Sequence, residues 1–121
     1  MNTKKQVGDF GESLALVFLE NKGYVLRAQN FRTRLGEIDL IMQNEEFLIF
    51  VEVKTRKNAH FGMAHEFVNE RKMMKIRTVA TLWLSKNETN LQPRFDIVEI
   101  YAPQGENTKN PEITHWEDAF S

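Results

Sequence analysis

The segment from Phe47 to Lys54 constrains the fold more than any other part of this 121-residue chain. Its first five residues are all apolar, which is typical of a strand covered on both faces in the middle of a sheet. Glu52 and Lys54 then place charges in this apolar setting, and because they are two residues apart they share one face of the strand. A buried carboxylate is costly unless a cation compensates it, so we expect a partner for Glu52.

A second apolar run carries another misplaced charge. Asp39 interrupts a strand predicted for residues 37–42, which we expect to form a hairpin with the strand at 47–54. If the turn is centred between positions 44 and 45, the numbers of any two residues that face one another across the hairpin add up to 89. Asp39 then lies opposite Phe50. Asp39 is then the diagonal neighbour of Glu52 on the same face, at about 7–8 Å. A loop with an odd number of residues would turn Asp39 to the other face.

The remaining pattern predicts helices around this hairpin. Apolar residues at helical spacing, Phe10 and Val17 among them, predict a helix from about Gly8 to Lys22. The same kind of spacing predicts a second helix from about Glu66 to Lys86. Extended chain is expected at 24–33, a strand at 95–101 and a short edge strand at 112–116. The order α-β-β-β-α-β indicates an α/β fold, a mixed sheet flanked by helices, within one domain of residues 1–121.

Asp39, Glu52 and Lys54 have the composition of a metal-dependent hydrolytic site. Two carboxylates with open positions suit Mg²⁺ or Mn²⁺, which favour oxygen ligands and share coordination with phosphate. Such an ion would polarise a scissile phosphate and activate a bound water, while Lys54 would orient the water and stabilise developing charge. The structural alternative is that Glu52 and Lys54 neutralise one another at a sheet end, with Asp39 exposed at a strand edge.

Four motifs together resemble the YraN-type family of bacterial nuclease-like proteins. They are Gly11-Glu12, Gly-Glu-Ile-Asp-Leu-Ile at 36–41, Phe-Val-Glu-Val-Lys-Thr-Arg at 50–56 and Arg-Phe-Asp-Ile-Val at 94–98. The resemblance covers nearly the whole chain, although Ile38 stands where the superfamily name has proline. That family is assigned to the PD-(D/E)XK nuclease superfamily. The resemblance therefore implies a restriction-endonuclease-like core with Asp39, Glu52 and Lys54 as its catalytic residues.

Glu12 has two interpretations. It matches the first-helix glutamate that many members of the superfamily use as an additional metal ligand, so the resemblance adds Glu12 to Asp39 and Glu52 in the metal site. Alternatively, Asp9 is the helix N-cap and Glu12, three residues on, completes a capping box. Asp96 also interrupts a strand, but no partner can be named for it and a hydrogen bond at the sheet edge is expected. His115 lacks the spacing of a metal ligand.

Positive charge is concentrated in three short segments, 27–34, 54–57 and 71–77, although the formal net charge is only -1. A basic face is therefore compatible with the neutral total, and Arg34, Arg56 and Lys72 are candidate contacts to a phosphate backbone. The alternative is that these cations are solvated surface residues.

The leading functional hypothesis is a Mg²⁺- or Mn²⁺-dependent endonuclease, a hydrolase that acts on DNA, with branched and single-stranded DNA both open as substrates. The alternative is a non-catalytic, nucleic-acid-binding accessory protein that retains the nuclease fold. The chain has no cysteine and neither a signal-peptide nor a membrane-span pattern, so a cytoplasmic location without a membrane partner is expected. Nucleases of this superfamily often act as dimers, which makes a homodimer one expected state.

Overall fold

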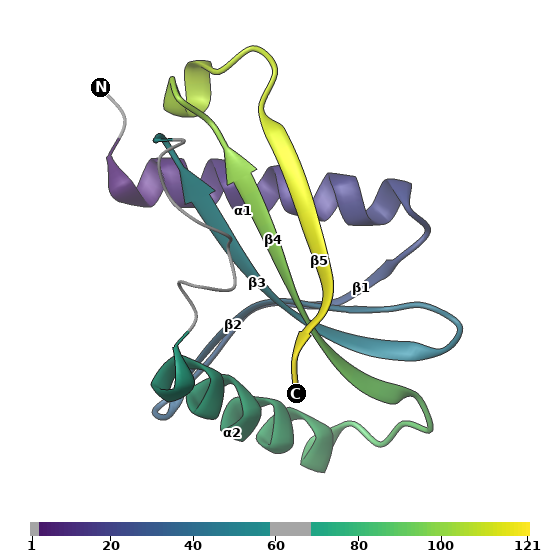
Figure 1. The fold of residues 1–121 in the computed structure, drawn as a ribbon. Helices are drawn as coiled ribbons and strands as arrows, with labels where there is room; N and C mark the ends of the chain where they lie inside the picture. The colour runs from purple at the N-terminus through teal and green to yellow at the C-terminus, as the bar shows by residue number, and fades with distance from the viewer. Residues whose placement is uncertain (1–2, 59–68) are drawn as a thin grey trace.

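A five-stranded mixed sheet forms the centre of the computed structural model, which describes residues 3–58 and 69–121 (Figure 1). The strands lie in the order β1-β2-β3-β4-β5; β3 and β4 are parallel and the other neighbours are antiparallel. The elements are α1 (Lys4–Asn21), β1 (Val25–Thr33), β2 (Gly36–Gln43), β3 (Phe47–Arg56), α2 (Glu70–Lys86), β4 (Gln92–Tyr101), the 3-10 turn η2 (Gly105–Asn107) and β5 (Glu112–Phe120). The predicted order α-β-β-β-α-β is confirmed, with β5 as a further strand.

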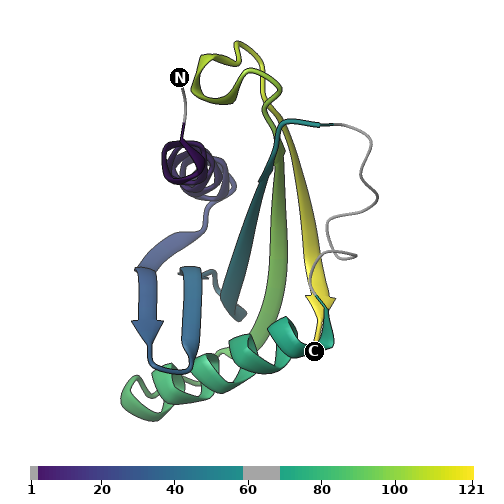
Figure 2. The ribbon, with the colours of Figure 1, turned by 90° about the vertical axis from the view of Figure 1, so that its left-hand side faces the viewer.

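The two helices cover opposite faces of β3, as its apolar sequence requires. Leu48 and Phe50 pack in a cluster with Trp83 and other residues of α2. The alternate residues Ile49 and Val51 pack in a second cluster that includes Ala15 and Leu19 of α1. Figure 2 shows α1 and α2 on either side of the sheet. The central strand is therefore buried on both faces through Glu52, and its end from Val53 onward is only partly buried.

Helix α1 begins four residues before the predicted start. Thr3 is the N-cap and forms a capping box with Gln6, in which each side chain bonds the other residue's backbone amide. Asp9 lies inside the helix and pairs with Lys5 at 2.9 Å. The interpretation of Asp9 and Glu12 as a capping box is therefore wrong, because the chain offers an earlier Thr-x-x-Gln signal. Glu12 has no capping role.

The buried face of α1 is a narrow stripe of residues four apart: Val7, Gly11, Ala15 and Leu19. Val17, which we expected to face inward, is 54% exposed. The stripe contains small residues because the helix lies close to β3: a Cβ atom on Gly11 would be 1.8 Å from Oγ1 of Thr55 and 3.0 Å from its Cβ. Gly11 therefore allows the close approach that brings the next residue, Glu12, toward the end of β3.

We expect Gly11→Ala to lower the free energy of unfolding by about 1–3 kcal/mol, because the added methyl overpacks the contact with Thr55. Gly8→Ala is the matched control: it lies on the same helix, and a Cβ atom there would meet no atom within 4 Å. Gly8→Ala should raise stability by up to about 1 kcal/mol, the usual gain in helix propensity. Urea denaturation of both variants checks the prediction, and equal effects at the two positions would contradict it.

Helix α2 and the outer strands also depart from prediction. Asn69 is the N-cap of α2, so the helix begins at Glu70, and residues 66–68 of the predicted helix lie outside the described residues. The edge strand β5 extends to Phe120, four residues beyond the predicted end. No helix within residues 3–58 and 69–121 is long and apolar enough to cross a membrane.

Asp96 on β4 is fully buried at the centre of a polar network. Arg94 donates to both of its carboxylate oxygens, at 2.9 and 2.8 Å. Nε2 of His115 donates at 2.7 Å and the backbone amide of Asp118 at 3.0 Å, both from β5. Arg94 also donates to the Tyr24 hydroxyl at 2.8 Å. Asp96 therefore ties β5 and the start of β1 to β4. Arg94 is its partner within β4, whereas His115 and Asp118 are partners from β5 that the sequence pattern does not reveal.

Burial alone would raise the pKa of Asp96, but hydrogen bonds from His115, Arg94 and the Asp118 amide outweigh it, so the pKa is lowered. A carboxyl group with a lowered pKa stabilises the folded state above the unfolded pKa, about 4, and loses that contribution as the pH falls. The network is thus a structural ion cluster that is intact at neutral pH.

Candidate active site

The β2–β3 hairpin positions the two central carboxylates. Leu40 pairs with Val51, so paired residue numbers sum to 91 and the predicted sum of 89 is wrong. The reason is the side chain of Asn44, whose Oδ1 accepts hydrogen bonds from the amides of Glu46 and Phe47 at 2.9 and 2.7 Å and moves the turn on by one residue. Residues 44–47, an even number, separate the last paired residues Gln43 and Leu48, so the predicted side-chain parity holds.

Asp39 and Glu52 lie where β2 and β3 diverge. The regular ladder ends at Leu40 and Val51, and the next residue of each strand is an acid. Figure 2 views the molecule from the side on which the two strands separate. The amide of Val53 donates to Oδ2 of Asp39 at 2.8 Å, so the aspartate side chain occupies the fork between the strands. The register sets Asp39 directly opposite Glu52, not diagonal to it as we predicted.

Burial and the neighbouring Glu52 raise the pKa of Asp39. Burial has the largest effect, followed by the hydrogen bond to the Glu52 carboxyl group and by the charge of Glu52; together they raise the pKa from 3.8 to about 9. The hydrogen bond from the Val53 amide opposes the shift. In the metal-free protein the Asp39 carboxyl group therefore keeps its proton at neutral pH, as expected for an acid buried beside another carboxyl group.

Glu52 is only 9% exposed, and its Oε2 atom is buried without a hydrogen-bond partner among the described residues. The cation next to this oxygen is Lys72 of α2, whose Nζ lies 3.2 Å away. Lys54 forms no ion pair with any residue in the described ranges. The structural alternative, in which Glu52 and Lys54 neutralise one another, is therefore not the arrangement found.

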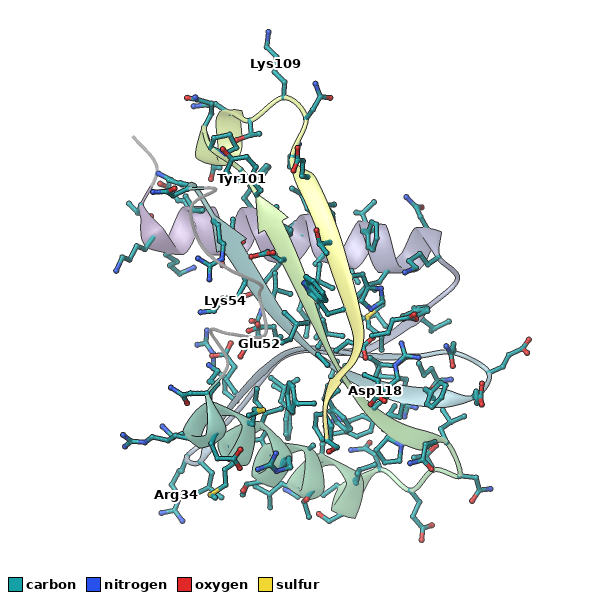
Figure 3. The ribbon with its side chains drawn as sticks, in the orientation of Figure 1. Arg34, Glu52, Lys54, Tyr101, Lys109 and Asp118 are labelled. Carbon is teal, nitrogen blue, oxygen red and sulfur yellow. The ribbon has the colours of Figure 1, made fainter. Side chains whose placement is uncertain are left out.

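One open cavity of about 660 Å³ collects the candidate residues. Glu12, Asp39, Glu52 and Lys54 all line it, together with the first turns of α1. Figure 3 shows Glu52 and Lys54 extending from β3 toward the same side of the molecule. Lys4 and Lys57, which sequence reasoning did not single out, add positive charge at the cavity wall. Lys57 ends the basic segment 54–57 noted in the sequence, whereas Lys4 carried no comparable signal.

Glu12 faces this cavity from α1. Burial raises its pKa, a hydrogen bond with Asn30 opposes the shift, and the charge of Glu37 raises the pKa further. Within the described residues, no three Asp, Glu, His or Cys side chains are grouped as ligands of one metal ion. Glu12 therefore borders the cavity without completing a preformed trio around Asp39 and Glu52.

The other predicted cations occupy different positions. Arg56 pairs with Glu99 at 2.9 Å, with both side chains largely buried. Lys72 pairs with Glu52. Arg34 is exposed at the β1–β2 turn, where it and Lys75 line a second cavity of about 310 Å³. Neither Arg34 nor Lys75 has an ion-pair partner within the described parts of the chain.

The carboxylate oxygens of Asp39 and Glu52 suit a hard divalent cation. Mg²⁺ is commonly bound through one or two carboxylates and keeps several water ligands, so two adjacent acids are sufficient. The buried Oε2 of Glu52 has no hydrogen-bond partner among the described residues, and burial together with the neighbouring Glu52 raises the pKa of Asp39. A cation between the two carboxylates would satisfy that oxygen and relieve the repulsion.

The fold and site define an α/β protein with a mixed sheet whose central hairpin presents two acids and a lysine to one cavity. The model of the family described as "Uncharacterised protein family UPF0102" matches residues 11–100. The chain belongs to this family, which is the YraN family that the sequence motifs predicted.

Relatives confirm the membership over nearly the whole chain. A UPF0102 protein of Alkaliphilus oremlandii is 43% identical over 119 residues, covering 96% of this chain and 98% of its own. One of Acetivibrio thermocellus is 41% identical and covers 98% of this chain and 94% of its own. One of Vibrio parahaemolyticus is 45% identical over 101 residues, covering 82% and 84%. The names of these relatives state no activity.

Proposed function

We propose that the protein is a Mg²⁺- or Mn²⁺-dependent endonuclease that hydrolyses phosphodiester bonds in DNA. The observation that carries this proposal is that Asp39 and Glu52 lie together at the fork of β2 and β3, beside Lys54, which forms no ion pair with a described residue. Two adjacent buried acids are costly in a protein without a cation to balance them. Such an arrangement is typical of functional sites, where perturbed pKa values cluster.

Asp39 and Glu52 would hold the metal ion, and Glu12 is the proposed third carboxylate on the opposite wall of the cavity. When bound, the ion supplies Lewis acidity to the scissile phosphate and lowers the pKa of a water. Lys54 holds the attacking water and places positive charge beside the phosphate as negative charge develops there. Water adds across the phosphorus–oxygen ester bond, which leaves a phosphomonoester and a free hydroxyl on the two product strands.

The decisive test is a cleavage assay with purified protein and Mg²⁺ or Mn²⁺, using duplex, branched and single-stranded DNA, with RNA of the same sequences for comparison. We expect cleavage of at least one DNA substrate by the native protein and none by Glu52→Gln. The proposal is wrong if no substrate is cut under either metal. If RNA is cut faster than every form of DNA, the proposed hydrolysis stands but the substrate is RNA.

A second candidate is a nucleic-acid-binding accessory protein without catalysis. It is favoured by the ion pair that Lys72 already makes with Glu52 and by the lack of a three-carboxylate group in the described residues. For this candidate, an Asp39→Ala, Glu52→Ala double variant should bind nucleic acid as well as the native protein, and neither should cut.

The proposed contacts to the phosphate backbone are Arg34, Arg56 and Lys72. Arg56 and Lys72 form ion pairs, whereas Arg34 has no ion-pair partner among the described residues. Arg34 and Lys75 line the same cavity, so an Arg34→Ala, Lys75→Ala variant should lose about tenfold in DNA affinity. The slope of log K against log salt should fall by about 1–2, as expected for lost phosphate contacts.

Fluorescence anisotropy across a salt series measures both quantities. The control is Lys109→Ala, since Lys109 is exposed on the β4–β5 loop, at the opposite end of the molecule from Arg34 (Figure 3). The prediction fails if the control lowers affinity and salt slope as much as the double variant does.

A further inference from the structure

The ion pair between Lys72 and Glu52 joins an exposed side chain to a buried one. Nζ of Lys72 is 3.2 Å from Oε2 of Glu52; the lysine side chain is 48% exposed and the glutamate 9%. The same Oε2 atom has no hydrogen bond from a described residue, so the contact lacks hydrogen-bond geometry. Buried carboxylate oxygens normally accept hydrogen bonds. Lys72 therefore neutralises the charge of Glu52 without satisfying its oxygen, and the ammonium can leave into solvent.

The position of Lys72 in its helix points to the same conclusion. Asn69 caps α2 and accepts a hydrogen bond from the Lys72 amide, so Lys72 is the third residue of the first turn. A helix N-terminus favours acidic side chains and disfavours cations. Lys72 therefore gains nothing from its helix, and its favourable electrostatic contact is with Glu52 on the sheet.

Lys72 also differs from the other cations around the cavity. Lys54, Lys4 and Lys57 line the cavity, but none of them forms an ion pair with Glu52. Lys72 comes from the opposite helix and supplies the positive charge that directly faces Glu52 in the described structure.

We propose that Lys72 is a built-in counter-ion of the metal site: its ammonium neutralises Glu52 in the metal-free protein and is displaced when a divalent cation binds. This inference rests on the proposed function, because it assumes that Glu52 is a metal ligand. Lys72 sets how tightly the ion binds, since the ion must compete with it. Once displaced, the ammonium is available to a phosphate group of the substrate, which gives one side chain two successive anionic partners.

The test compares Mn²⁺ affinity, measured by electron paramagnetic resonance of free Mn²⁺, in the native protein and in Lys72→Met. We expect Lys72→Met to bind Mn²⁺ roughly three- to tenfold more tightly, the effect of removing a partly exposed competing charge. Arg71→Met is the matched control: it removes the same charge from an exposed neighbour that pairs with no described residue. The Mn²⁺ affinity of Arg71→Met should differ from that of the native protein by less than twofold. Lys72→Gln provides a second variant if the methionine form folds poorly.

Thermal unfolding supplies an independent readout of the same competition. In EDTA, Lys72→Met should melt at a lower temperature than the native protein, because Glu52 is left without a counter-ion. Saturating Mn²⁺ should then raise its melting temperature by more than it raises that of the native protein. A variant that is less stable without metal but binds metal more tightly is the signature of a displaced counter-ion.

Two outcomes would overturn the inference, and they separate it from the proposed function. If the native protein binds Mn²⁺ and Asp39→Asn does not, but Lys72→Met binds it no more tightly than Arg71→Met, the inference alone is wrong. If neither the native protein nor any Lys72 variant binds Mn²⁺, both the inference and the proposed metal site are wrong.

Discussion

Asp39→Asn is expected to abolish Mn²⁺ binding and lower the cleavage rate by roughly a thousandfold or more, while it stabilises the metal-free protein. The asparagine oxygen can still accept the hydrogen bond that Val53 donates to Asp39. The change puts a neutral amide in place of a carboxyl group whose pKa is raised to about 9, first by burial and then by Glu52. Because the amide never ionises, the substitution should raise the free energy of unfolding by about 1–2 kcal/mol at pH 8.

The stability effect has a defined dependence on pH. Because the pKa of Asp39 in the folded state lies above its unfolded value of about 4, its contribution to stability is complete below pH 4. That contribution is lost as the pH rises toward 9. Native protein in EDTA should therefore lose stability from pH 5 to pH 9 relative to Asp39→Asn, and saturating Mn²⁺ should remove the difference.

Urea denaturation at several pH values in EDTA, combined with Mn²⁺ titration, checks both parts. Asp9→Asn is the control, because Asp9 is an exposed acid on α1 that pairs with Lys5 outside the site. Retention of native Mn²⁺ affinity by Asp39→Asn would contradict the assignment of Asp39 as a ligand, and lower stability at pH 8 would contradict the electrostatic account.

The largest loss of stability is expected at Asp96. Asp96→Ala leaves Arg94 and His115 without their buried acceptor, and removing one partner of a buried ion pair commonly costs about 3–5 kcal/mol. Arg94 retains the Tyr24 hydroxyl and a weak contact to Glu117 at 3.4 Å, which do not replace two charge-assisted bonds. Melting temperature and urea midpoint should both fall sharply.

Asp96→Ala should leave metal affinity unchanged wherever the variant is still folded, because the network lies outside the cavity that Asp39 and Glu52 line. Glu88→Ala, an exposed acid between α2 and β4, serves as the control for loss of one negative charge. A cost below about 1 kcal/mol for Asp96→Ala would show that the network contributes little to the fold.

The sequence was sufficient to predict the central strand and the order of elements. The apolar run of β3 requires cover on both faces, and helical spacing identified α1 and α2. The predicted register was wrong by two residues, because it depends on hydrogen bonds from the turn to the Asn44 side chain that move the centre of the turn. The start of α1 was wrong because two capping signals compete near the N-terminus and Thr3 is the one used.

The candidate site was predicted in part for a similar reason. Glu52 and Lys54 share a face by strand parity alone, and an even loop brings Asp39 to them. The partner of Glu52 could not be predicted, because Lys72 is twenty residues away on a helix whose packing angle no local pattern specifies. Two partners of Asp96, His115 and Asp118, likewise come from β5, and only Arg94 is its neighbour along the chain.

The central claim, a divalent metal held by Asp39 and Glu52, is tested most directly by anomalous diffraction from a crystal soaked in Mn²⁺. The account predicts an anomalous peak bonded to both carboxylates, with the Lys72 ammonium withdrawn from Glu52. A crystal in which Mn²⁺ binds elsewhere or nowhere, and in which Lys72 remains on Glu52 at saturating Mn²⁺, would contradict it.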